Sequence, residues 1–168
     1  GAFAHIAAKK IFPNDNLIPF PSFKKAYDSV EKNECDYAVL PLENSFAGDV
    51  NQVFDLMFRG KLYVTKMFKL KIEQTLLGIK GTKLSDIKTV ISHQQAIDQC
   101  IEYIHSHNFQ IETASNTAIA ANLVSQKNDK SFAAIGSEET ANLYNLEIIE
   151  KNINENEENT TRFAVFSN

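Results

Sequence analysis

The segment 89–124 has the sequence TVISHQQAIDQCIEYIHSHNFQIETASNTAIAANLV. Residues 89–91 form a short apolar run typical of a buried strand. Residues 94–107 are predicted to be one helix, because apolar side chains recur at helical spacing on one face: Ile97, Cys100, Ile101 and Ile104. A strand at 109–112 and a helix at 117–126 then repeat the order. Alternation of strands and helices is typical of an α/β protein.

The same alternation extends to both sides of this segment. Further elements are predicted, in chain order, as a helix capped by Ser22, a strand at 37–40, a loop at 43–46, a helix at 50–57 ended by Gly60, an alternating strand at 68–72, a strand at 132–135, a helix at 137–144 and a final strand at 162–166. Strands that feed helices favour right-handed crossovers and parallel pairing. We therefore predict an α/β fold with mostly parallel sheets flanked by helices. The Asn- and Glu-rich segment 150–159 is predicted to be a solvated surface loop.

Composition restricts the class of protein. With 168 residues, 43% of them hydrophobic and 23% charged, the chain can bury a core as one domain or as two small lobes. A net charge of -4 argues against a nucleic-acid partner, and no apolar run is long enough to span a membrane. Cys35 and Cys100 lie far apart and no signal-peptide pattern is present, so we expect a cytoplasmic protein with reduced thiols.

Polar side chains follow four of the predicted strands. They are Glu43, Asn44 and Ser45; Ser92, His93 and Gln94; Ser115, Asn116 and Thr117; and Gly136 and Ser137. Each group precedes a predicted helix, whose N-terminal N–H groups favour an anion, so we expect an anionic small molecule as ligand. Any one of these residues alone is more typical of an ordinary helix cap than of a ligand contact. Their shared position is what favours a site.

Other kinds of chemistry find little support. His105 and His107 are two residues apart and point to different faces of a helix, so no metal site is predicted. A GxSxG nucleophile elbow and glycine-rich phosphate loops are also absent from the sequence. Cys35 is interpreted as a small buried hydrophobe, and Cys100 as a residue one turn into a helix.

Five motifs in order resemble the prephenate dehydratase family along almost the whole chain. They are residues 1–8 (GAFAHIAA); Pro41, Leu42, Glu43, Asn44, Ser45 and Gly48; Ser92, His93, Gln95, Ala96, Gln99 and Cys100; Thr117, Ala118, Ala120 and Ala121; and Thr161, Arg162 and Phe163. Two positions depart from the family pattern: Ala4 replaces a serine or threonine, and Gln94 replaces a proline. The first departure removes one hydroxyl from the expected site.

The resemblance implies two α/β lobes in a periplasmic-binding-protein-like arrangement of type II, with the substrate in a cleft between them. Lobe 1 would hold about residues 1–73 plus 161–168, and lobe 2 about residues 74–160. The family's opening strand normally stands just before Gly1, so we expect an exposed strand edge or a gap in the first sheet. The family's ACT domain would follow this chain, and whether a chorismate mutase domain also flanked it stays open.

The implied reaction removes carboxylate and hydroxide from prephenate and gives phenylpyruvate, on the shikimate-pathway route to phenylalanine. Aromatisation drives this lyase reaction, so no cofactor is expected. By the resemblance, Thr161 stabilises the departing oxygen, and Asn44, Ser92 and Gln99 orient the substrate. Arg162 and helix N-termini at Ser45 and Thr117 would offset carboxylate charge, with Ala118 beside Thr117 in the binding set. An ion pair of Arg162 with a nearby acid is an equally open reading.

Two other classes of function are weighed against this one. A non-catalytic binding or sensor module of the same two-lobed fold would have no need for Thr161, Gln99 and Asn44 together. A structural or protein-interaction domain predicts a large exposed apolar patch, which the sequence does not show. A homodimer is expected from the resemblance alone, and the choice between prephenate and arogenate stays open.

Overall fold

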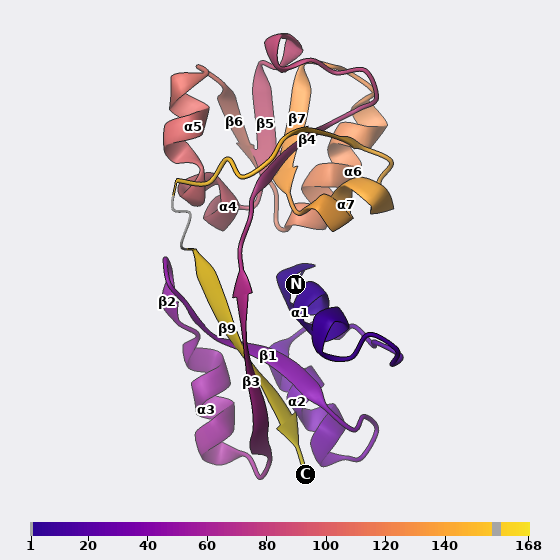
Figure 1. Cartoon of the computed structure of the whole chain (residues 1–168), viewed down its shortest axis with the longest axis vertical. Helices are drawn as coiled ribbons and strands as arrows, with labels where there is room; N and C mark the ends of the chain where they lie inside the picture. Colours follow the sequence, from indigo (N-terminus) through magenta and orange to yellow (C-terminus); the bar gives the residue numbers. More distant parts are fainter. Residues whose placement is uncertain (1, 156–158) are drawn as a thin grey trace. The chain divides into compact units, whose positions relative to one another are not determined.

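The computed structural model describes residues 2–155 and 159–168, which form two compact units (Figure 1). Unit 1 comprises residues 3–72 and 159–168, and unit 2 comprises residues 73–155. Each unit has its own sheet and its own buried hydrophobic clusters. Gly1 of the opening motif and residues 156–158 of the predicted surface loop lie outside the described residues.

Unit 1 is built on a four-stranded sheet of order β2-β1-β9-β3. Its elements are α1 (Ala2–Ile11), α2 (Phe23–Glu31), β1 (Ala38–Asn44), β2 (Gly48–Asp49), α3 (Asn51–Arg59), β3 (Tyr63–Lys71) and β9 (Thr160–Ser167). Strand β9 lies between β1 and β3 and is antiparallel to both. The C-terminal strand therefore completes the sheet of the N-terminal part of the chain.

Different helices cover the two faces of this sheet. Successive side chains of a strand point to opposite faces. Ala164 of β9 packs in a cluster with Tyr27 of α2 and Val53 of α3, whereas Phe163 packs with Ala7 of α1. Neighbouring residues of β9 therefore face different helices.

Two helix boundaries of unit 1 confirm the local predictions. The Ser22 hydroxyl oxygen accepts a hydrogen bond from the N–H of Lys25 at 3.2 Å and so caps α2. Helix α3 ends at Arg59, and Gly60 caps it. A Cβ atom at Gly60 would lie 2.2 Å from the Tyr27 hydroxyl oxygen, so the close approach of α2 requires glycine here.

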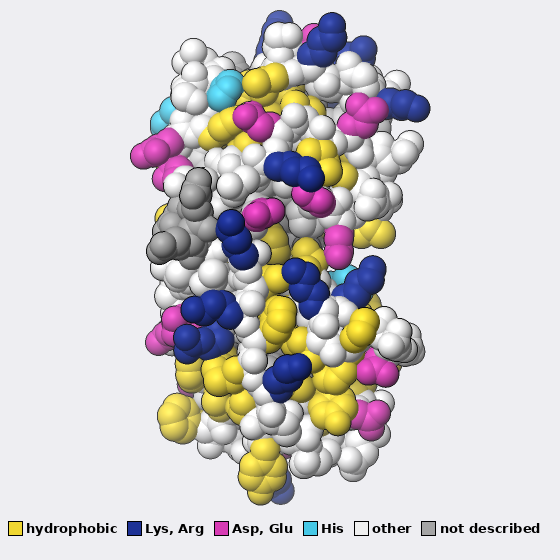
Figure 2. Space-filling view, in the orientation of Figure 1, with side chains coloured by type: hydrophobic (Ala, Val, Ile, Leu, Met, Phe, Trp, Pro, Cys, Tyr) yellow, Lys and Arg dark blue, Asp and Glu magenta, His cyan; other side chains and the backbone are white. Residues whose placement is uncertain are grey.

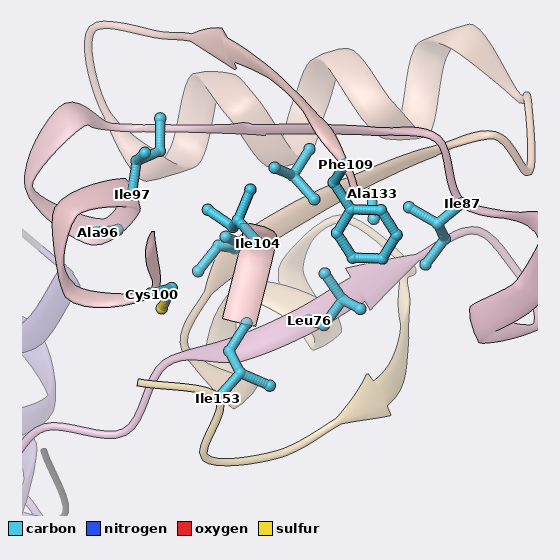
Figure 3. Packing of buried hydrophobic residues seen from close by; sticks show 11 residues of the cluster. Leu76, Ile87, Ala96, Ile97, Cys100, Ile104, Phe109, Ala133 and Ile153 are labelled. Carbon is cyan, nitrogen blue, oxygen red and sulfur yellow. The ribbon is translucent and has the colours of Figure 1, made fainter. Parts of the chain in front are cut away.

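Unit 2 is built on a five-stranded sheet of order β6-β5-β7-β4-β8. Its elements are β4 (Thr75–Gly78), the 3₁₀ helix η1 (Leu84–Asp86), β5 (Thr89–Ser92), α4 (Gln94–Gln99), α5 (Ile101–Ser106), β6 (Gln110–Thr113), α6 (Thr117–Lys127), β7 (Phe132–Gly136), α7 (Glu138–Leu143) and β8 (Glu147–Glu150). Figure 3 shows one of its cores, in which Cys100, Ile104, Phe109 and Leu76 pack together.

The α/β class with helices flanking two sheets is confirmed, but the strand pairing is mixed instead of mostly parallel. Strand β5 is parallel to β6 and β7, as the strand–helix–strand order predicts. Strand β4 is antiparallel to β7 and β8. The crossover rule does not apply to β4, which follows β3 directly, or to β9, which joins its sheet from the far end of the chain.

The prediction of a single helix over 94–107 is wrong, because the chain breaks at Cys100 into α4 and α5. Cys100 has φ −117° and ψ 15°, and its N–H donates to the Ile97 carbonyl. The carbonyl of Gln99 accepts from the N–H of Glu155 at 3.0 Å. At the break, the Gln99 carbonyl therefore bonds to a distant segment of the chain. The local spacing of apolar residues does not reveal this contact.

The described part of segment 150–159 is only partly the predicted solvated loop, since Glu150, Lys151, Asn152 and Glu155 are exposed but the other three residues are not. Ile153, Asn154 and Asn159 are all buried. The N–H of Ile153 donates to the Gln74 carbonyl at 3.0 Å, and the Asn154 side chain accepts from the Gln74 N–H at 2.9 Å. Polar composition indicates solvation only when the side chains lack internal partners, and here they have them.

The two edges of the unit 1 sheet have different surroundings. Strand β1 pairs with β2 at Glu43 and Asn44. The rest of that edge faces a groove of about 800 Å³, whose lining includes α1, residues 12–22 and β1 itself. Ala4, which the family resemblance places at the expected site, lines this groove, whereas the predicted catalytic and substrate-binding residues do not. At the other edge, β3 exposes Met67 and the neighbouring Lys66 and Lys69, and Figure 2 shows hydrophobic side chains among Lys and Arg over this unit. Lysines on an edge strand oppose pairing with another sheet.

Candidate active site

The side-chain amide of Asn44, the last residue of β1, is held in one orientation. Its Oδ1 accepts from the N–H of Phe46 at 2.9 Å and from the N–H of Ala47 at 2.8 Å. Because a carbonyl oxygen has two lone pairs, both are used by backbone donors, and the other end of the amide is the NH₂ group. Asn44 therefore presents two donors in fixed directions.

Thr161 receives one of these donors. Asn44 and Thr161 are direct partners in the antiparallel register of β1 and β9. Asn44 Nδ2 donates to Thr161 Oγ1 at 2.8 Å, and both residues are buried. Within the described part of the chain, the Thr161 hydroxyl has no acceptor for its own proton. The structure thus brings together two of the three predicted catalytic residues and leaves the Thr161 hydroxyl as a donor.

Asn159 is a third member of this cluster, and the sequence reading misses it. Its Oδ1 accepts from Asn44 Nδ2 at 3.1 Å, and its side chain is almost fully buried. Asn159 belongs to an Asn- and Glu-rich segment whose side chains suggest solvation. Its place two residues before Thr161 is the one signal that points to it.

Ser45 joins the end of β1 to the start of β9. Its N–H donates to the Thr160 carbonyl, and its Oγ accepts from the Thr160 N–H, both at 2.9 Å. The prediction that Ser45 stands at a helix N-terminus is wrong, because β2 intervenes and α3 begins at Asn51. The predicted loop at 43–46 is instead the end of a strand followed by a turn that Asn44 closes.

Arg162 lies on the opposite face of β9 from Thr161, as alternation requires. Its partners in the register are Glu43 on β1 and Lys69 on β3, and it is exposed. The structure therefore does not bring Arg162 together with Asn44 and Thr161. Glu43 lies opposite Arg162 in the register, but the described residues contain no ion pair of Arg162, so the ion-pair interpretation stays a prediction.

In unit 2, Gln99 ends α4 and forms a buried amide pair with Gln74. Gln74 Nε2 donates to Gln99 Oε1 at 2.9 Å, and both side chains are buried. This bond leaves the Gln99 NH₂ group as its remaining donor end. Gln74, like Asn159, is missed from the sequence, because nothing local distinguishes it from any polar residue beside a strand.

Ser92 is fully buried at the end of β5, and its hydroxyl proton is already used. Its Oγ donates to the carbonyl of Ile135 on β7 at 2.7 Å. A hydroxyl has one proton, so Ser92 offers a ligand only its lone pairs. The predicted role of Ser92 in orienting substrate is therefore restricted to accepting.

Thr117 and Ala118 are the first residues of α6, at the positive end of the helix dipole. Asn116 caps the helix, because its Oδ1 accepts from the N–H of Ile119 at 2.8 Å. The Thr117 methyl group packs on Gly136, where a Cβ atom would lie 2.6 Å from it. Ala118 is exposed and has no polar side chain, so its backbone N–H is the one donor that it could offer a ligand.

The titratable groups do not form a second reaction centre. Burial, with a smaller effect of Glu155, raises the pKa of the Cys100 thiol to about 12, so at neutral pH it is an unreactive thiol. His93 caps α4, with its Nδ1 accepting from the N–H of Gln95. Among residues 2–155 and 159–168, no three His, Cys, Asp or Glu side chains lie close enough to hold a metal ion. In the same residues no helix is long and apolar enough to cross a bilayer.

The Asn44–Thr161 cluster can stabilise an oxygen on which negative charge develops. A hydroxyl held by a fixed donor cannot turn its lone pair away, and in a site with little water its O–H is a preorganised hydrogen-bond donor. Thr161 is 8% exposed and Asn44 7% exposed, so competing water is largely excluded from both. This chemistry is that of a leaving-group stabiliser.

Comparisons with known proteins agree with this reading. The family model described as Prephenate dehydratase matches residues 1–168. The chain is 39% identical to arogenate dehydratase/prephenate dehydratase 1, chloroplastic, of Arabidopsis thaliana, over 99% of this chain and 43% of that protein. It is 36% identical to a bifunctional chorismate mutase/prephenate dehydratase of Buchnera aphidicola, over 99% of this chain and 45% of that protein.

Solved structures are similar as well. The prephenate dehydratase of Arthrobacter aurescens, in complex with L-Phe, has a TM-score of 0.88 and 27% identity over 98% of this chain and 56% of that one. GqqA, described as a novel type of quorum quenching acylase, has a TM-score of 0.87 and 28% identity over 98% and 60%. The chain thus spans less than half of these two curated relatives. It belongs to the prephenate dehydratase family.

Proposed function

We propose that this chain converts prephenate to phenylpyruvate, carbon dioxide and water, as a carbon–oxygen lyase in phenylalanine biosynthesis. The observation that carries the proposal is the Thr161 hydroxyl. Its oxygen accepts from Asn44 at 2.8 Å, and its proton is left for another acceptor. A departing ring hydroxyl is such an acceptor.

The reaction needs two bonds to break together. The pair of electrons from the C–CO₂ bond moves into the ring as the ring C–OH bond breaks, and aromatisation makes the change favourable. The departing oxygen gains negative charge, and Thr161 donates a hydrogen bond to it while a proton from solvent completes water. Asn44 keeps Thr161 in the donor role throughout.

Arogenate is the competing substrate, because the Arabidopsis relative is described as both an arogenate and a prephenate dehydratase. Both substrates have the ring carboxylate that is lost and the ring hydroxyl on which Thr161 would act. They differ in the side chain, which is a keto acid in prephenate and an amino acid in arogenate. The Thr161 chemistry is the same for both, and we propose prephenate as the substrate of this chain.

The test is an assay of the 168-residue chain with each substrate in turn. Phenylpyruvate is measured by its absorbance at alkaline pH, and phenylalanine from arogenate by chromatography. We expect phenylpyruvate at an enzymatic rate. Folded protein that binds prephenate without turnover would support the sensor reading instead, and turnover of arogenate alone would change the substrate.

An acyl-transfer reaction, the activity for which GqqA is described, is a second candidate that the geometry does not favour. A threonine nucleophile needs a base to take its proton. The described partner of Thr161 Oγ1 is an amide NH₂ group, which donates a hydrogen bond and cannot act as a base.

Partners and location are also part of the proposal. The Buchnera relative is described as bifunctional with chorismate mutase, which supports flanking domains in the full-length protein. We propose a homodimer from the family alone. Two separate cysteines, one of them fully buried, support a reducing compartment such as the cytoplasm.

A further inference from the structure

Asn159 lies beside Asn44 and Thr161, and it precedes Thr161 by two residues in the chain. Its backbone carbonyl accepts from the N–H of Ile72 at 2.8 Å, which fixes it against the end of β3. Its Oδ1 then accepts from Asn44 Nδ2 at 3.1 Å and, more weakly, from Ser45 Oγ at 3.4 Å. Asn159 is 2% exposed, so water does not substitute for these bonds.

The hydrogen bonds of the Asn44 amide can be counted completely. Its Oδ1 has two lone pairs, which are used by the backbone N–H groups of Phe46 and Ala47. Its Nδ2 has two protons, of which one goes to Thr161 Oγ1 and the other to Asn159 Oδ1. The remaining contact, to the Thr160 carbonyl, is longer at 3.4 Å. Asn159 therefore takes the proton that Thr161 does not.

We propose that Asn159 is a positioning residue for Thr161, an inference that rests on the proposed function. By holding one Nδ2 proton of Asn44, it keeps the other on Thr161 Oγ1 and so keeps the Thr161 proton available to the leaving oxygen. Without Asn159 the amide can tilt toward the Thr160 carbonyl, and the Thr161 hydroxyl is then free to rotate.

The kinetic test places Asn159→Ala in two backgrounds, the natural chain and Thr161→Ala. In the natural chain we expect kcat to fall about tenfold with little change in KM, because one hydrogen bond of a connected network is lost. In the Thr161→Ala background the same substitution should have almost no further effect on kcat. A similar fall in both backgrounds would show that Asn159 does not act through Thr161.

The matched control is Thr65→Val, which removes a side-chain hydrogen bond to β9 that involves none of Asn44, Asn159 and Thr161. Thr65 Oγ1 donates to the Val165 carbonyl at 3.2 Å, away from Asn44 and Thr161. Thr65→Val should leave kcat unchanged. If it lowers kcat as much as Asn159→Ala does, then loss of β9 packing explains both and the proposal fails.

A second readout needs no substrate. The side-chain amide protons of Asn44 can be followed by NMR, and in Asn159→Ala their exchange with solvent should be about tenfold faster. Asn159→Asp keeps an acceptor oxygen and should retain the slow exchange. Unchanged exchange in Asn159→Ala overturns the positioning role. If the natural chain shows this protection but no turnover of prephenate, the proposed function fails and the network does not.

Discussion

Thr161 in unit 1 and Ser92 in unit 2 are both buried hydroxyls near a strand end, and their hydrogen bonds run in opposite directions. Thr161 Oγ1 accepts from Asn44 Nδ2, whereas Ser92 Oγ donates to the Ile135 carbonyl. The Thr161 proton has no acceptor among the described residues, whereas the Ser92 proton is bound to a backbone carbonyl. Burial and position therefore do not distinguish a hydroxyl with an available proton from a structural one, whereas the identity of the hydrogen-bond partner does.

The largest expected effect tests the Thr161 side of this comparison. Thr161→Ala removes the donor to the leaving oxygen and should lower kcat about 10²-fold or more while the chain stays folded. Thr161→Ser keeps a hydroxyl opposite Asn44 and should stay within about tenfold of the natural kcat. The assay is steady-state formation of phenylpyruvate, with circular dichroism to check folding. Near-normal turnover by Thr161→Ala would remove Thr161 from the mechanism.

A smaller effect is expected when the direction of the Thr161 hydrogen bond is reversed. Asn44→Asp replaces the donor NH₂ with an oxygen, so the Thr161 proton is drawn toward residue 44 and away from the substrate. We expect kcat to fall about tenfold with the turn at Phe46 and Ala47 preserved.

Asn33→Asp is the control for the added negative charge. It makes the same change on an exposed residue of unit 1 that bonds to Asn168. Equal rates for Asn44→Asp and the natural chain would mean that the direction of this bond is unimportant.

Sequence patterns predict those helix boundaries that depend on neighbouring residues in the chain. The cap at Ser22 and the end of α3 at Gly60 are confirmed, because each cap makes its hydrogen bond within about one helical turn. The break at Cys100 and the antiparallel course of β9 depend on contacts with segments far away in the sequence. Periodicity carries no information on those contacts.

The same distinction explains which site residues are found. Asn44 and Thr161 are found because they belong to motifs that the family shares. Asn159 is separated from Asn44 by 115 residues and is embedded in a polar segment, so its only local signal is its place two residues before Thr161. Gln74 is similar, since its partner Gln99 lies 25 residues away. Buried polar networks require the fold before they can be read.

The Ser92 side of the comparison predicts a loss of stability instead of activity. Ser92→Ala leaves the buried Ile135 carbonyl without this donor and should lower the free energy of unfolding by roughly 1 to 2 kcal/mol. Turnover should change less than about threefold, because the Ser92 proton does not reach a substrate. Urea unfolding and the phenylpyruvate assay measure the two quantities on the same sample. A 10²-fold loss of kcat in folded Ser92→Ala would erase the distinction between the two hydroxyls.

Cys100 sharpens the comparison further, because its proton is kept mainly by burial instead of by a hydrogen-bond acceptor. Its ordinary pKa of 9.0 is raised to about 12, mainly by burial. Between these values the folded chain holds a proton that the unfolded chain has lost, so the free energy of unfolding falls as pH rises. From pH 8 to pH 10 the natural chain should lose about 1 kcal/mol more than Cys100→Ala, as measured by urea midpoints. Burial also raises the pKa of Tyr27 and Tyr103. Because Cys100 is itself a smaller cause of the raised Tyr103 pKa, Tyr103→Phe is placed in both chains so that the difference isolates the thiol. Equal losses of unfolding free energy in the two chains would mean that the thiol ionises within the fold. A proton in this core would then need a hydrogen-bond acceptor, as the Ser92 proton has, to be retained.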